Sequence, residues 1–270
     1  MSLRAEAITD PARLEELSEA WDELAVDAAL PFCAPGWLLP WWREAAPQGA
    51  RLHAVAAFDG ERLVALAPFF VDGDALLPLG CGANTRVEPL TRPGREADAN
   101  RALAPLLAGS GAAVVRLSGI PKFSPWPELL AQAWPGGRAW LHEDERMPAP
   151  VAEVAGSFDE WLGSRSSRMR NHLRKYERLL RERDARVELA ADAGAVAAFA
   201  SLHRARWAGR GGSGVLDDRV ERAVAAAATA LPRGRFRLFT IDTAGGPVAT
   251  AVFVAAGGEV NSWLGGFDDA

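Results

Sequence analysis

The sequence contains few of the residues from which disulfide frameworks, zinc sites and membrane spans are built. Among its 270 residues there are two cysteines, Cys33 and Cys81, which are too few for a disulfide framework and lack zinc-ligand spacing. No apolar run approaches the roughly 18–20 residues that a membrane-spanning helix needs. The N-terminal stretch MSLRAEAITD also lacks the apolar segment of a signal peptide. We therefore expect two reduced thiols in a cytoplasmic protein with no bound metal and no membrane span.

Signature motifs of several enzyme classes are also absent. The sequence has no G-x-S-x-G, H-E-x-x-H or Walker A motif, which disfavours serine hydrolases, zinc peptidases and P-loop NTPases. Its four histidines form no cluster with metal-ligand spacing. Lysine is scarce, with only Lys122 and Lys175. The net charge of -5 argues against a protein whose whole surface binds nucleic acid.

What the sequence does contain is typical of a globular protein. Hydrophobic residues make up 49% of the chain and charged residues 24%, and its length predicts one large domain or two small ones. Such a chain is long enough to bury a sizeable core. We expect most of the ten tryptophans to pack there.

In the first half of the chain the hydrophobic periodicity changes from helical to alternating. Residues 11–27 and 35–45 have apolar residues at helical spacing. Residues 51–80 are then predicted to form three strands, joined by hairpin turns at Asp59-Gly60 and Asp72-Gly73. Four further elements are expected in this half: a helix near 96–109, a strand near 112–118, a helix near 126–134 and a strand near 138–142.

The second half begins with a long predicted helix over residues 158–184, in which Ser157 and Glu160 have the spacing of a capping box. A second three-strand run is predicted over residues 235–266, with glycine pairs at its two turns. Between them we expect a strand at 186–191, a helix at 193–208, a glycine-rich loop at 209–214 and a helix at 217–230.

The two three-strand runs have the same strand–turn plan at nearly the same spacing, which indicates an internal duplication. We place the two units at residues 1–150 and 151–270. The first run is followed by helix, strand, helix and strand, whereas the sequence stops just after the second run. If the units are alike, the second lacks roughly fifty or more residues. The alternative is a second unit that is simply smaller.

Several stretches, in this order, resemble one known family. They are Pro31-Phe32 with Trp37 and Trp41-Trp42, then 66–69, 158–162 with Arg168, Arg170 and Arg174, then 203–207, 236–238, 246–249 and 265–268. The order resembles the CelD/BcsL-like acetyltransferases, which have tandem GNAT units and are related to Fem-type aminoacyltransferases. The resemblance implies an α/β fold with mixed, mostly antiparallel central sheets flanked by helices, and with the second unit incomplete.

The resemblance also implies an activity. A GNAT enzyme transfers an acyl group, here acetyl from acetyl-CoA, directly to an amine or hydroxyl in a ternary complex. The acceptor expected from the family is a small molecule, such as a polysaccharide or cell-envelope precursor. The third strand of the second run would receive the acetyl carbonyl and the pantetheine arm. By position, the expected cofactor-binding residues are Asn261, Ser262, Trp263, Leu264 and Gly265. The family's pyrophosphate-binding loop and helix follow residues like 265–268, and they are missing from this sequence.

Three residues are candidates for the catalytic base: His203, Glu88 and Asp268. A fourth candidate site is the loop at 206–214, which fits both R-x-x-G-x-G and G-x-G-x-x-G. A phosphate loop of this kind should follow a strand, whereas this one follows a predicted helix. A plain helix–helix connection or a substrate-side loop is therefore expected.

A basic stretch leaves alternative functions open. It contains Arg165, Arg168, Arg170, Arg174, Lys175, Arg178, Arg181, Arg183 and Arg186. It is either a solvated helix face with ion pairs or a surface for an anionic partner. The anion would be CoA phosphates, an acidic glycan precursor or, in a Fem-type enzyme that uses aminoacyl-tRNA, a tRNA. A noncatalytic binding protein or truncated remnant is the alternative of a different class.

Overall fold

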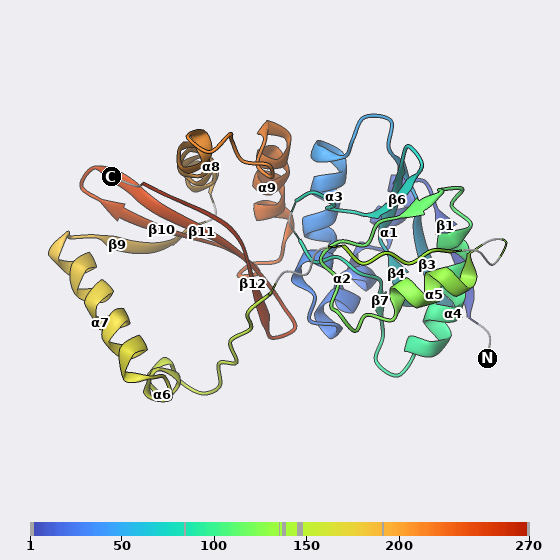
Figure 1. Cartoon of the computed structure of the whole chain (residues 1–270), viewed down its shortest axis with the longest axis horizontal. Helices are drawn as coiled ribbons and strands as arrows, with labels where there is room; N and C mark the ends of the chain where they lie inside the picture. Colours follow the sequence, from blue (N-terminus) through green and yellow to red (C-terminus); the bar gives the residue numbers. More distant parts are fainter. Residues whose placement is uncertain are drawn as a thin grey trace.

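The structure is a computed structural model that describes residues 3–83, 85–134, 136, 139–144, 148–190 and 192–268. Two groups of strands lie side by side with helices between them and around them (Figure 1). The first group comes from the N-terminal half of the chain and the second group from the C-terminal half.

Two four-stranded sheets form the first group. One has the order β1-β3-β4-β7 and is antiparallel throughout; the other has the order β2-β5-β6-β8, with β6 and β8 parallel. The strands are β1 (Arg4–Ile8), β2 (Arg51–Leu52), β3 (Ala54–Asp59), β4 (Arg62–Ala67), β5 (Phe69–Asp72), β6 (Ala75–Pro78), β7 (Leu90–Thr91) and β8 (Val114–Val115). The sheets join where β2 runs into β3 and β4 into β5. Pro68 separates β4 from β5, because proline has no N–H to give to a ladder.

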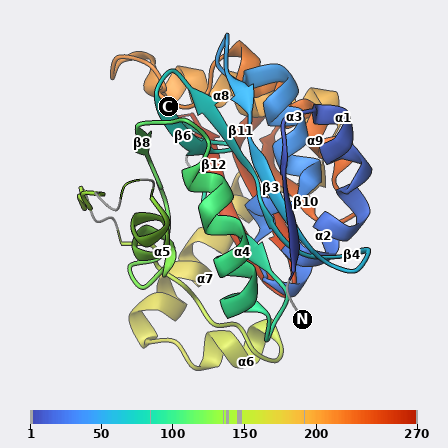
Figure 2. The ribbon, with the colours of Figure 1, turned by 90° about the vertical axis from the view of Figure 1, so that its right-hand side faces the viewer.

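Helices cover both faces of this first group (Figure 2). They are α1 (Pro11–Glu16), α2 (Ser18–Asp27), the 3-10 helix η1 (Pro31–Cys33), α3 (Pro35–Ala45), α4 (Glu96–Ala108) and α5 (Trp126–Ala133). Along β3, Val55 and Ala57 pack toward α4, whereas Ala54, Ala56 and Phe58 belong to the core on the side of α2 and α3. Because both faces are covered, β3 is apolar at almost every position.

The second group is a single antiparallel sheet, called here sheet C, in the order β12-β11-β10-β9. Its strands are β9 (Arg186–Ala190), β10 (Phe236–Thr243), β11 (Gly246–Ala256) and β12 (Glu259–Phe267), accompanied by α8 (Ala193–Ala208) and α9 (Asp218–Ala230). One face packs on α8, with Leu238 and Val252 in the same core as Phe199. The other face carries exposed Val187 and Leu189.

The same order of elements therefore occurs twice. A strand, β1 or β9, is followed by helices and then by three antiparallel strand segments, and in each case the first strand pairs with the first of the three. The predicted α/β class with mostly antiparallel sheets is confirmed. The boundary at residue 150 and the incompleteness of the second unit stay predictions.

Two helices, of which the second contains most of the basic stretch, lie apart from sheet C (Figure 1). They are α6 (Phe158–Gly163), which begins with the predicted capping box of Ser157 and Glu160, and α7 (Ser167–Glu182). No side chain of either helix is fully buried. After α7 the chain turns sharply at Asp184, where φ is 49°, and enters β9.

One hydrophobic core joins the two halves of the chain. The indole of Trp263 on β12 lies edge-on to Trp37 of α3, with 5.2 Å between ring centroids, and its Nε1–H donates to the Ala83 carbonyl at 2.6 Å. Arg235, just before β10, forms an ion pair with Asp22 of α2, in which Nη1 donates to both carboxylate oxygens at 2.6 and 2.7 Å. In the same core, burial raises the pKa of the Cys33 thiol to about 12. The halves are thus packed as one body.

Several expected elements differ from those observed. The helices expected at 11–27 and 158–184 are each broken in two, near Leu17 and at residues 164–166. The strand expected at 112–118 is confined to β8. The prediction of a strand at 138–142 is wrong for residues 139–142, because they form no strand. Residue 138 lies outside the described residues. Strand β1 was not predicted, because its apolar positions are mostly alanine, which has a low strand propensity.

Replacing Trp263 by phenylalanine tests the joint core. The ring packing is largely kept, but the buried Ala83 carbonyl loses its donor, which costs about 1–3 kcal/mol of unfolding free energy. Urea unfolding followed by circular dichroism measures this loss. The matched control is Trp140→Phe, because Trp140 is 96% exposed and its replacement should leave stability unchanged. Equal stability of the two variants would contradict a stabilising hydrogen bond from Trp263 to the Ala83 carbonyl.

Candidate functional site

The five residues expected to bind a cofactor all lie on β12. Trp263 is buried, Ser262 is exposed, and Asn261, Leu264 and Gly265 are half-buried. The pairing of β12 with β11 is irregular at this point: Ala251 faces Gly265 and Phe253 faces Ser262. One residue of β11 is thus opposite two of β12, which is a β-bulge at Trp263 and Leu264. A bulge leaves backbone groups out of the ladder.

The other edge of β12 has no partner strand among the described residues, because β12 is the terminal strand of sheet C. An unpaired edge presents a row of N–H and C=O groups that another extended chain or an amide-containing ligand can bind. In Figure 1, β12 is the strand of sheet C nearest the first half of the protein, and the C-terminal end of the strand turns away from it.

His203 is held inside the protein next to the bulge. It lies on α8, is 3% exposed, and has a hydrogen-bond partner on each ring nitrogen. Its Nδ1 is 2.9 Å from the Gly265 carbonyl oxygen, and its Nε2 is 2.8 Å from Oγ of Ser213. Phe199 and Trp207 flank the imidazole ring, with centroids at 5.8 and 6.2 Å. Sequence reasoning missed Ser213, because a serine in a glycine-rich loop carries no signal of its own.

Two glycines allow α8 and β11 to approach β12 closely. A Cβ on Gly266 would lie 2.7 Å from the Leu202 carbonyl carbon and nearer still to the His203 nitrogen, both in the backbone of α8. A Cβ on Gly265 would lie 2.8 Å from the Thr250 carbonyl oxygen of β11. No side chain fits at either position without a backbone shift, so both glycines are required by packing.

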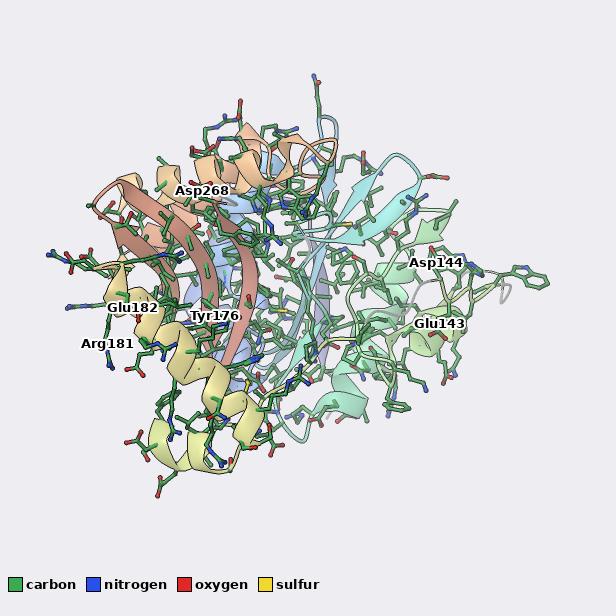
Figure 3. The ribbon with its side chains drawn as sticks, turned by 60° about the vertical axis from the view of Figure 1, so that its left-hand side comes forward. Glu143, Asp144, Tyr176, Arg181, Glu182 and Asp268 are labelled. Atoms are coloured by element: carbon green, nitrogen blue, oxygen red, sulfur yellow. The ribbon has the colours of Figure 1, made fainter. Side chains whose placement is uncertain are left out.

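The two other candidate bases lie elsewhere. Glu88 precedes β7 in the first half of the chain, where its half-buried carboxylate forms an ion pair with Arg86 at 2.7 Å. Asp268 follows β12, and its backbone N–H donates to the Val248 carbonyl at 2.8 Å. Figure 3 shows Asp268 at the far end of sheet C, above α7. Of the three candidates, only His203 contacts the predicted donor-binding residues through a hydrogen bond described here.

The glycine-rich loop at 209–214 is not built to hold a phosphate. It follows the C-terminus of α8, where unpaired carbonyl groups disfavour an anion. The helix after it, α9, has the Asp217 side chain on its first N–H groups and acidic Asp218 and Glu221 in its first turn. The interpretation as a helix–helix connection is therefore supported by the charges around the loop.

In the first half of the chain, the N-terminus of α4 is also unsuited to an anion. The N-terminus of α4 has Glu96 and Asp98 in its first turn, and Glu96 accepts the Gly94 N–H at 3.0 Å. The nearby cations are already neutralised, since Arg92 pairs with two carboxylates of α2 and Arg95 pairs with Asp59 at 2.7 Å. A diphosphate at this position would meet carboxylates instead of free N–H groups.

The basic face of α7 is accessible. Within the helix, Arg178 pairs with Glu182 at 3.5 Å and Arg181 pairs with Glu177. Figure 3 shows Arg181 and Glu182 on the outer side of the helix and Tyr176 nearer the strands. Both readings of this stretch, a solvated face and an anion-binding surface, fit these contacts.

Across the described ranges, no group of three histidine, cysteine or acidic side chains is arranged to hold a metal ion. Likewise, none of the helices in the described part of the chain has both the length and the apolar character required to cross a bilayer.

Residues 167–270 match the family model described as "Acetyltransferase (GNAT) domain". The match runs from α7 to the end of β12 and includes His203 and the bulge. It identifies this part of the chain as GNAT-like and leaves the donor and acceptor open. No curated protein matches the chain.

One solved structure with detectable similarity is a "Tandem GNAT protein from the clavulanic acid biosynthesis pathway (without AcCoA)". It is 14% identical, the alignment covers 99% of this chain and 80% of that chain, and the TM-score is 0.37.

Replacing Gly266 by alanine tests the close contact of α8 with β12. The added methyl group overlaps the α8 backbone, so we expect a loss of about 1–3 kcal/mol of unfolding free energy. The matched control is Gly214→Ala, because a Cβ at Gly214 has nothing within 4 Å. Chemical unfolding of both variants measures the difference, and a stable Gly266→Ala variant would refute the packing described.

Proposed function

We propose that this chain carries an acyltransferase domain that moves an acetyl group from acetyl-CoA to an amine or hydroxyl. The observation that supports the proposal is the unpaired, bulged edge of β12, within the segment that matches a GNAT acetyltransferase domain. The proposed donor-binding residues are Asn261, Ser262, Trp263, Leu264 and Gly265.

The chemistry of the donor suits such an edge. The pantetheine arm of acetyl-CoA has two amide groups, which pair with an unpaired strand edge much as another strand would. Leu264 lies in the bulge and has no register partner on β11. An N–H there can donate to the thioester carbonyl, whose oxygen gains negative charge as the acceptor attacks. Trp263 would contribute through its backbone, since its side chain is buried in the core.

The reaction needs little more than this strand and an acceptor. The amine or hydroxyl attacks the thioester carbonyl directly in a ternary complex, and the CoA thiolate leaves. A base takes the proton of the attacking group, and the candidates for this role are His203, Glu88 and Asp268. The acceptor class that we propose is a polysaccharide or cell-envelope precursor, which follows from the family resemblance alone.

Acetyl-CoA titration tests the proposal. Isothermal titration calorimetry of the purified chain should show saturable binding of acetyl-CoA and no binding of ATP. The variant Leu264→Pro removes the bulge N–H and should weaken binding by roughly tenfold or more, about 1.4 kcal/mol. Its matched control, Leu264→Ala, keeps the N–H and should bind within about twofold of wild type.

Circular dichroism must first show that both Leu264 variants are folded. The absence of saturable acetyl-CoA binding by a well-folded wild-type chain would sink the acetyltransferase proposal for this chain. It would leave the alternative of a noncatalytic binding protein.

A second candidate function is supported by one observation, the accessible basic face of α7. A Fem-type aminoacyltransferase would use such a face to bind the phosphates of an aminoacyl-tRNA. Filter binding should then show tRNA retention that falls steeply with salt and is reduced by the double variant Arg174→Glu, Arg178→Glu. Tight acetyl-CoA binding without tRNA retention would exclude this candidate.

A further inference from the structure

The bulge of β12 is fixed from several directions at once. On one side of it, Trp263 is anchored by Trp37, Phe199 and the Ala83 carbonyl. On the other side, Gly266 rests against the backbone of α8. Gly265 lies between these anchors. Its carbonyl forms a hydrogen bond with His203, which lies outside sheet C. This hydrogen bond is thus the side-chain contact that holds the part of the strand between the two anchors.

The proton on His203 can be assigned from the hydrogen bonds of Ser213. Oγ of Ser213 accepts the N–H groups of Val215 and Leu216 at 3.3 and 3.1 Å. Its single hydrogen is therefore free to donate to Nε2 of His203, at 2.8 Å. Nε2 is then an acceptor, and Nδ1 carries the hydrogen that it donates to the Gly265 carbonyl at 2.9 Å. The Gly265 carbonyl can only accept a hydrogen bond, so Ser213 and Gly265 require the same tautomer of His203.

Holding the Gly265 carbonyl also holds the backbone N–H of the next residue. The peptide unit between Gly265 and Gly266 is planar, so a donor fixed on the Gly265 carbonyl oxygen also sets the direction of the Gly266 N–H. Glycine has no side chain to restrict its backbone rotation, so a contact from outside the strand has more effect here than at another residue.

We infer that His203 is a positioning residue for the proposed donor site. Through Nδ1–H it fixes the peptide group between Gly265 and Gly266, and through Ser213 it ties the loop after α8 to the same point. This inference rests on the proposed function in so far as β12 binds acetyl-CoA. The imidazole of His203 is buried and both of its nitrogens have partners inside the protein. This favours a positioning role over that of a base, which must reach the acceptor.

Two isosteric variants separate the two hydrogen bonds. The amide of asparagine lies near the position of Nδ1, so His203→Asn can still donate to the Gly265 carbonyl. The amide of glutamine reaches the position of Nε2, so His203→Gln keeps the Ser213 contact and loses the one to Gly265. If His203 positions the bulge, the affinity for acetyl-CoA should fall about tenfold in His203→Gln. In His203→Asn it should stay within about threefold of the wild-type value.

Amide hydrogen exchange at Leu264, Gly265 and Gly266 is the second measurement, and it requires no ligand. Exchange at these amides should be faster in His203→Gln than in His203→Asn at equal overall stability. If wild type binds no acetyl-CoA, the proposed function fails, and this exchange difference still decides whether His203 positions the strand. Equal exchange in both variants would overturn the positioning role.

Ser213→Ala tests the assignment of the tautomer while leaving the histidine in place. Imidazole nitrogen-15 shifts of the wild type should show a protonated Nδ1. The variant should keep this tautomer, because the Gly265 carbonyl still accepts from Nδ1, but its Nε2 shift should change because that nitrogen has lost its donor. An unchanged spectrum would overturn the part of the inference that concerns Ser213. Loss of acetyl transfer in both His203 variants with wild-type donor affinity and exchange would instead identify His203 as a base.

Discussion

The rest of the structure depends on the burial of one indole ring across the joint between the two halves of the chain. Trp263 belongs to β12, yet its packing partners include Trp37 of the first half and its N–H is satisfied by Ala83. A strand with an unpaired edge would otherwise be mobile at its backbone. Because the ring is enclosed, the first half acts as a rigid support for the strand on which the proposed chemistry takes place.

The two halves have the same order of elements but differ in their polar contacts. In the first half, acidic side chains occupy the start of α4, and Arg92 and Arg95 are neutralised by carboxylates. In the second half, the start of α9 is also acidic, but α8 and the loop after it meet β12 through a buried polar network centred on His203. This network, and not the charge at a helix start, is what distinguishes the second half.

Much of the fold could be predicted from local patterns. Helices with an apolar stripe, such as α3 and α9, and hairpins with glycine turns were found at nearly their observed bounds. The breaks at Leu17 and at residues 164–166 were not found, because the apolar pattern continues across them. At the site, the strand β12 was predicted from its pattern and its donor-binding role by resemblance, whereas the contact of His203 with Gly265 joins residues 62 positions apart and has no local signature.

The outer strand of sheet C, β9, shows how an exposed edge is kept from pairing with other molecules. Its apolar residues Val187 and Leu189 alternate with Arg186 and Glu188. A foreign strand docking on this edge would have to bring its own side chains next to both charge signs, which few sequences tolerate. Charged residues at alternate positions of this five-residue segment thus disfavour the addition of a further strand to sheet C.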